Sequence, residues 1–157
     1  KSLFKVPRHL LVCHSSFFED MFKLPQSDGD VVEGSSDEYP IDLVGTSSEE
    51  LDVLFDFLYN GMYADHSPTI EAWINLLSIA HRLLFDRARA RAIKEITMLQ
   101  DSMDPFLLIQ LSHKYDVREW ILPASIRIAE RPGLLEVKEM ASIPIDLAVL
   151  VSRSREV

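Results

Sequence analysis

The chain has little cysteine and little glycine, and each shortage excludes a class of site. Its single cysteine, Cys13, rules out an internal disulfide framework and any zinc site built from several cysteines. The five glycines form no glycine-rich phosphate loop after a predicted strand. One cysteine also fits a reducing compartment, so we expect an intracellular protein of the cytoplasm or nucleus.

Positive charge and long apolar runs are scarce as well. The 25 Asp and Glu outnumber the 16 Lys and Arg, and the resulting net charge of -9 repels the phosphate backbone of nucleic acids. No apolar run approaches the roughly 18 to 20 residues that cross a bilayer, since even "IPIDLAVLV" is interrupted by Asp146. We therefore expect neither direct nucleic-acid contact nor membrane insertion.

Large apolar residues are concentrated in one stretch, "LFDFLYNGMY" at 54–63. Ser47 and Glu50 match the Ser-x-x-Glu capping box, and Gly61 is a stop signal, so the pattern predicts a helix over 48–60. Its apolar residues surround the helix except for a narrow polar ridge. Such a helix must be nearly enclosed. It lies either at the centre of the core or in a position where another molecule partly covers it.

Two alternating segments predict short strands. "LFKVPR" alternates apolar and polar residues from Leu3 to Val6 and ends at Pro7, which cannot donate to a strand ladder. "YPIDLVG" at 39–45 alternates in the same way and is closed by a glycine.

Between these strands, apolar spacings of three and four in "HLLVCHSSFFEDMFKLP" predict two short helices, stopped by Pro25. Ser15 or Ser16 is placed to cap the second helix. The residues from Gln26 to Tyr39 carry too little apolar area to offset the entropy of ordering, which predicts a mobile acidic loop. We expect no calcium there, because the oxygen ligands lack the spacing of a calcium loop.

The second half of the chain predicts helices alone. A helical hairpin bends near Phe85 and Asp86, where Asp86 is placed to cap the second helix. In that helix Arg87, Arg91 and Lys94 fall opposite the apolar side, so the basic run is interpreted as a solvated face. Further helix boundaries are predicted at Asp104, Pro105, Pro132, Gly133 and Pro144.

No catalytic or metal-binding pattern is visible, so we expect a non-enzymatic chain without cofactors. Cys13 and His14 are neighbours that diverge by about 100 degrees on a helix, and Cys13 is expected to be buried packing. The histidines lack the spacing of metal ligands. The alternative is a helical enzyme or ligand-binding domain assembled from distant residues such as His81, His113 and Asp116, which requires them to share one concave pocket.

The order of strand, two short helices, polar loop, strand, aromatic helix and helical hairpin resembles the BTB/POZ domain. The resemblance is carried by "LFKVPRHLLVCHSSFFEDMF", "YPIDLVGTSSEELDVLFDFLYNGMY" and "WINLLSIAHRLLFDRARARAI", and the whole is most similar to fungal BTB-domain proteins. It implies an α+β fold, mostly helical with a small sheet, at 1–100, followed by a helical extension at 101–157. The family's first strand is expected upstream of the fragment.

The resemblance implies a protein-protein interaction module that forms homodimers. Leu10 and Leu11 match the first-helix region of family dimer faces, although apolar helical residues are also ordinary core. Some members are substrate adaptors of cullin-type ubiquitin ligases, and the matching cullin or partner contacts are Leu24, Gln26 and Tyr59. The alternative within the family is a transcriptional regulator or scaffold that binds no cullin.

The sequence departs from the family at several places. Adaptors carry a hydrophobic-x-Glu motif where this chain has Gln26, and "VVE" at 31–33 offers the right letters only farther along. Pro7 replaces the histidine that normally precedes the residue matched to Arg8. The family's charged pocket pairs that residue with an Asp expected upstream of this fragment, so a pocket role for Arg8 is not implied. Glutamine in place of the expected glutamate weakens the adaptor interpretation.

Overall fold

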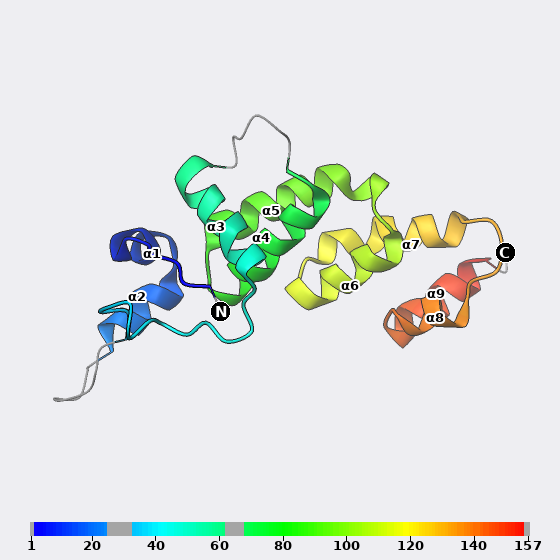
Figure 1. Ribbon diagram of the computed structural model, residues 1–157. Coiled ribbons are helices and arrows are strands. Elements are labelled where there is room, and N and C mark those ends of the chain that lie inside the picture. Colours follow the sequence, from blue (N-terminus) through cyan, green and yellow to red (C-terminus); the bar gives the residue numbers. More distant parts are fainter. Residues whose placement is uncertain (1, 25–32, 62–67, 156–157) are drawn as a thin grey trace. The chain divides into compact units, whose positions relative to one another are not determined.

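The computed structural model describes residues 2–24, 33–61 and 68–155, which fold mainly as helices (Figure 1). Contacts divide the chain into two units, Lys1–Ala92 and Ile93–Val157. This division differs from the predicted boundary between residues 100 and 101, which stays a prediction. None of the helices in the described part of the chain is long and apolar enough to span a membrane.

Three predicted signals of the first unit stand at helix ends, whereas the helix that Asp86 is expected to cap begins at Asp86 itself. Ser15 caps the second helix through its hydroxyl, Ser47 and Glu50 form the predicted capping box, and Gly61 ends the third helix in the left-handed conformation at φ +60°. The last helix of the set continues into the second unit. The helices are α1 (Arg8–His14), α2 (Ser16–Lys23), α3 (Ser48–Asn60), α4 (Ile70–Arg82) and α5 (Asp86–Leu99).

The core of the first unit is built around α4 rather than α3. Five α4 side chains are at most 3% exposed, whereas Leu54 is the only buried apolar residue of α3. Of the two alternatives given for this helix, a place at the centre of the core therefore does not fit the structure. Its other apolar residues are half-buried or exposed, which leaves cover by another molecule as the alternative. The five α4 residues are Trp73, Leu76, Leu77, Ile79 and Ala80.

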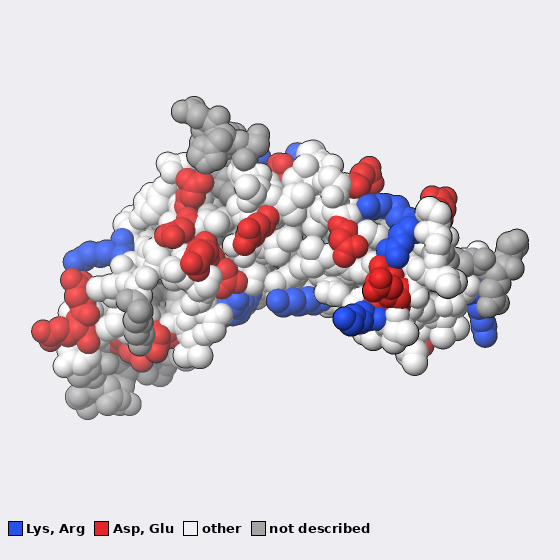
Figure 2. All heavy atoms as spheres, turned by 45° about the vertical axis from the view of Figure 1, so that its right-hand side comes forward, with Lys and Arg blue, Asp and Glu red and all other residues white. Residues whose placement is uncertain are grey.

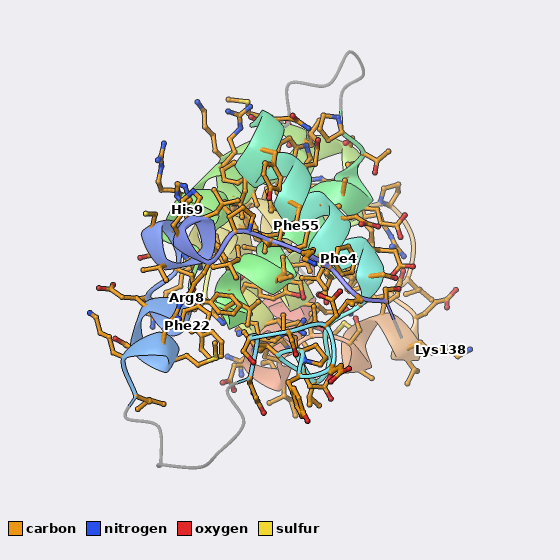
Figure 3. The ribbon with its side chains drawn as sticks, turned by 60° about the vertical axis from the view of Figure 1, so that its left-hand side comes forward. Phe4, Arg8, His9, Phe22, Phe55 and Lys138 are labelled. Carbon is orange, nitrogen blue, oxygen red and sulfur yellow. The ribbon has the colours of Figure 1, made fainter. Side chains whose placement is uncertain are left out.

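Neither predicted strand forms. Within the described ranges, the bridge pairing is one isolated antiparallel bridge between Ser36 and Tyr39. Leu3–Val6 runs as extended chain, and Phe4 packs against Phe55 of α3 with 5.4 Å between ring centroids (Figure 3). A strand needs a partner for its backbone donors and acceptors, and alternation in one segment does not supply it. The small sheet is not confirmed.

The second unit is helical, as predicted. Asp104 caps one helix by accepting from two backbone amides, with Pro105 at the first helical position, and α7 ends before Pro132 and Gly133. Trp120 is fully buried and donates from Nε1 to Oγ1 of Thr97 at 2.8 Å. The elements are η1 (Gln100–Ser102), α6 (Pro105–Tyr115), η2 (Arg118–Trp120), α7 (Ile121–Glu130), α8 (Val137–Ala141) and α9 (Ile145–Arg155).

Candidate protein-binding surface

The first helix keeps its apolar residues partly accessible. None of the seven residues of α1 is buried, and Leu10 and Leu11 are half-buried. Such side chains contribute to the unit's packing and still present apolar surface outward. We call the surface of α1 that carries Leu10 and Leu11 the first-helix face. Its role in dimers stays a prediction.

Arg8 joins α1 to α2. Its guanidinium carbon lies 4.0 Å from the centroid of the Phe22 ring, and its NH2 group donates to the Phe22 carbonyl at 3.3 Å (Figure 3). A cation held over an aromatic face at an exposed site is worth about 0.5–1 kcal/mol. Arg8 therefore helps to hold α1, which carries the first-helix face, against α2.

Ser15 anchors the same pair of helices to the rest of the unit. Its hydroxyl accepts from the Phe18 amide at 3.2 Å and donates to the Leu83 carbonyl at 2.6 Å, and the residue is 2% exposed. Phe18 meets Phe85 edge to face at 6.1 Å. Cys13, predicted to be buried, is exposed, because Ser15 and Phe18 make the buried contacts between this pair of helices and the rest of the unit.

The predicted cullin contacts lie on separate elements. Leu24, directly after α2, is 66% exposed, and Tyr59 near the end of α3 is 56% exposed. The ends of α2 and α3 lie apart in Figures 1 and 3, so the structure gives two separate exposed positions. Gln26 lies outside the described residues, as do Val31 and Val32 of the "VVE" match.

The charge around α3 is mainly negative. Acidic side chains gather on the face of the first unit shown in Figure 2, and α3 carries exposed Glu49 and Asp52 but no Lys or Arg. Beside Leu24, Lys23 donates to Glu19 at 2.6 Å, and this hydrogen bond raises the pKa of Lys23. A partner that covers α3 would meet mainly negative charge around its apolar residues.

A basic hollow of about 380 Å³ lies at the C-terminal end of α3. Arg87 and Arg91 line it, four residues apart on α5, although the sequence suggested only a solvated face for them. Arg91 also lies 5.8 Å from the ring centroid of Trp73. Guanidinium groups beside apolar side chains suit an acidic group of a protein partner. The other lining residues are His14, Phe57, Leu58 and Gly61.

The alternative built on dispersed polar residues gains no support. His113 and Asp116 are exposed in the second unit, and Asp116 pairs with Arg118 at 3.5 Å. His81 lies in the first unit and does not line the basic hollow. Among the residues that the structure describes, no group of three or more His, Cys, Asp or Glu could hold a metal ion.

A family model of the BTB/POZ domain matches residues 1–99, a span that ends at the last residue of α5. No curated protein and no solved structure gives a match. The matched span covers more than half of the chain and includes the first-helix face, α3 and the helical hairpin. The chain therefore belongs to the BTB/POZ domain family, whose members are generally protein-protein interaction modules.

Proposed function

We propose that this chain is a non-enzymatic interaction module that forms a homodimer through the first-helix face. The observation that carries the proposal is that α1 and α3 are rich in large apolar residues, yet only Leu54 among these residues is buried. Partly exposed apolar surface on a family of interaction domains favours a protein partner. Leu10 and Leu11 are the residues through which the copies would meet.

A second part of the proposal concerns an adaptor role for cullin-type ubiquitin ligases. The exposed ring of Tyr59 and the exposed side chain of Leu24 support it, because aromatic and apolar anchors dominate protein interfaces. Gln26 in place of the family's glutamate favours the alternative, a transcriptional regulator or scaffold that binds no cullin. The proposal also includes an intracellular location and similarity to fungal members. For the domain organisation we propose a BTB core at 1–100 and a helical extension at 101–157.

Charge substitutions test the adaptor role. Tyr59→Asp and Leu24→Asp should each weaken capture of a cullin N-terminal domain about thirtyfold, as expected for interface anchors worth about 2 kcal/mol. Val44→Asp is the matched control, because Val44 is an apolar residue of the same unit that is 85% exposed. Circular dichroism should show that all three variants keep their helices.

Each outcome of this test decides between the two roles. Binding of the unsubstituted chain that both variants lose and Val44→Asp keeps would support the adaptor. No binding of the unsubstituted chain would reject the adaptor in favour of the scaffold or regulator, and equal binding by all variants would reject Tyr59 and Leu24 as the contacts.

A further inference from the structure

The second unit carries a row of exposed side chains at a spacing of four. Arg118 lies on the turn η2 that leads into α7, and Leu122, Ile126 and Glu130 follow along α7. Leu122 is 69% exposed and Ile126 is 46% exposed. We call these four residues the α7 ridge. It lies outside the span that the family model matches.

The ridge borders an apolar hollow. The hollow has a volume of about 650 Å³ and is lined from α7 and from α9. On the α9 side, Leu150 is 58% exposed, while Val151 beneath is 3% exposed. Leu122, Ile126 and Leu150 line the same hollow, so they form a continuous apolar patch rather than scattered surface residues. Covering it would remove apolar area from water, which is favourable in proportion to that area.

The charges at the two ends of the ridge identify an occupant. Arg118 and Glu130 are equally far from Ala124 along the chain, and Leu122 and Ile126 are also equally far from it. When two copies of the ridge run antiparallel about a twofold axis, Arg118 therefore faces Glu130 of the second copy, and Leu122 faces Ile126 of the second copy. The ridge is complementary to itself in charge and in apolar character.

Helix packing permits this arrangement. Side chains spaced by four form the ridges that interdigitate in the commonest class of helix-helix contact, in which the two ridges run alongside each other. Arg118 is free to turn toward a second copy, because its bridge to Asp116 is long at 3.5 Å and both side chains are more than 70% exposed. Glu130 is exposed as well.

We propose that the α7 ridge is a second self-association surface, which binds a second copy of this chain in antiparallel orientation. The interaction is independent of the first-helix face, because its residues lie in the second unit. The ridge extends over about 18 Å of helix, so the interface is small and its affinity is modest. Copies that also pair through the first-helix face would assemble beyond the dimer.

A charge-exchange experiment on the full 157-residue chain tests the proposal. Arg118→Glu places Glu opposite Glu at both ends of the paired ridges, and Glu130→Arg places Arg opposite Arg. Each variant alone should associate about tenfold more weakly through the ridge, as expected when two exposed ion pairs become repulsive. Mixing the two variants should restore binding, because every end contact in the mixed pair then joins Glu to Arg.

The measurement is sedimentation velocity at chain concentrations from about 10 µM to about 1 mM, which spans the affinity of a small interface. Lys138→Glu is the matched control for Arg118→Glu, because Lys138 is exposed in the same unit and does not line the hollow. This control should associate like the unsubstituted chain. Leu122→Asp combined with Ile126→Asp should remove the ridge association altogether, with helix content unchanged.

Three results would overturn the proposal. In the first, Arg118→Glu and Glu130→Arg each associate as strongly as the unsubstituted chain. In the second, the mixture of the two variants associates no more strongly than either variant alone. In the third, Lys138→Glu loses its association. Dimers of the first-helix face do not depend on Arg118 or Glu130, so they persist in every charge variant. Failure of the ridge therefore leaves the proposed function standing, and failure of the first-helix face leaves the ridge testable.

Discussion

At the scale of single residues, Arg82 connects several segments of the first unit through its side-chain hydrogen bonds. Its guanidinium donates to the carbonyl of Gly45, to Oγ1 of Thr46 at 3.0 Å and to Oε1 of Glu50 at 2.8 Å. The Glu50 side chain is 11% exposed, and its other oxygen accepts from the Ser47 amide at 3.0 Å. One ion pair therefore joins the start of α3 to the end of α4.

We expect Arg82→Met to lower the free energy of unfolding by about 1–3 kcal/mol, because it leaves a nearly buried carboxylate without its charged donor. Urea unfolding followed by circular dichroism measures the change. Glu50→Gln in the Arg82→Met background should cost less than Glu50→Gln alone, since the uncompensated charge is then removed. Lys94→Met, an exposed position on α5, is the control, and an equal loss there would contradict this account.

Residue-scale contacts were predictable from the sequence only where they are local. The caps Ser47 and Asp104, and Ser15 as one of two candidates, are predictable because a capping side chain bonds an amide two or three residues away. The pair of Arg82 and Glu50 joins residues 32 positions apart, so no local pattern announces it.

At the scale of elements, the corner between α1 and α2 depends on Ser15. Its hydroxyl serves α2 as a cap and also satisfies the carbonyl of Leu83 at the end of α4. The first-helix face therefore keeps its place through one buried side chain together with the packing of Phe18.

We expect Ser15→Ala to destabilise the protein by about 2 kcal/mol, because it removes a cap and leaves a buried carbonyl without its donor. Hydrogen exchange should then accelerate in α1 and α2 more than in α4. The matched control is Ser16→Ala, since Ser16 is exposed and does not cap the helix. Uniform acceleration across the first unit would argue that the corner has no separate anchor.

Element predictions succeeded for helices and failed for strands for one physical reason. A helix satisfies its hydrogen bonds within its own segment, so caps and spacing predict it, whereas a strand depends on a distant partner. The sequence leaves open what encloses α3, because periodicity shows which residues are apolar but not which neighbours cover them. The hollow beside Arg87 and Arg91 has no signal in the sequence, because it depends on α1 and α3.

At the scale of the whole molecule, each unit contains one of the two tryptophans. Trp73 is buried in the first unit and Trp120 in the second. In the second unit, Arg127 donates to the carbonyls of Gln100 and Met103 at 2.7 and 2.8 Å, which ties η1 to α7. The two indoles therefore report separately on the two units.

We expect Arg127→Met to lower the stability of the second unit by about 2–3 kcal/mol, because two charge-assisted hydrogen bonds are lost. Adding Arg127→Met to a Trp73→Phe protein, which retains only Trp120, should lower the midpoint of unfolding followed by fluorescence. The same Arg127→Met substitution in a Trp120→Phe protein, which retains only Trp73, should lower the midpoint much less. Equal shifts of both transitions would mean that the two units unfold as one.

The most direct test of the central claim is the molar mass of the full chain in solution by sedimentation equilibrium, measured in the Arg118→Glu background to weaken the α7 ridge. The account predicts a dimer that becomes a monomer when Leu10→Asp and Leu11→Asp are added, with helix content unchanged. His9→Glu, at an exposed neighbouring position, should weaken the same dimer with less risk to folding. A strict monomer at about 1 mM, or a dimer indifferent to all three substitutions, would contradict association through the first-helix face.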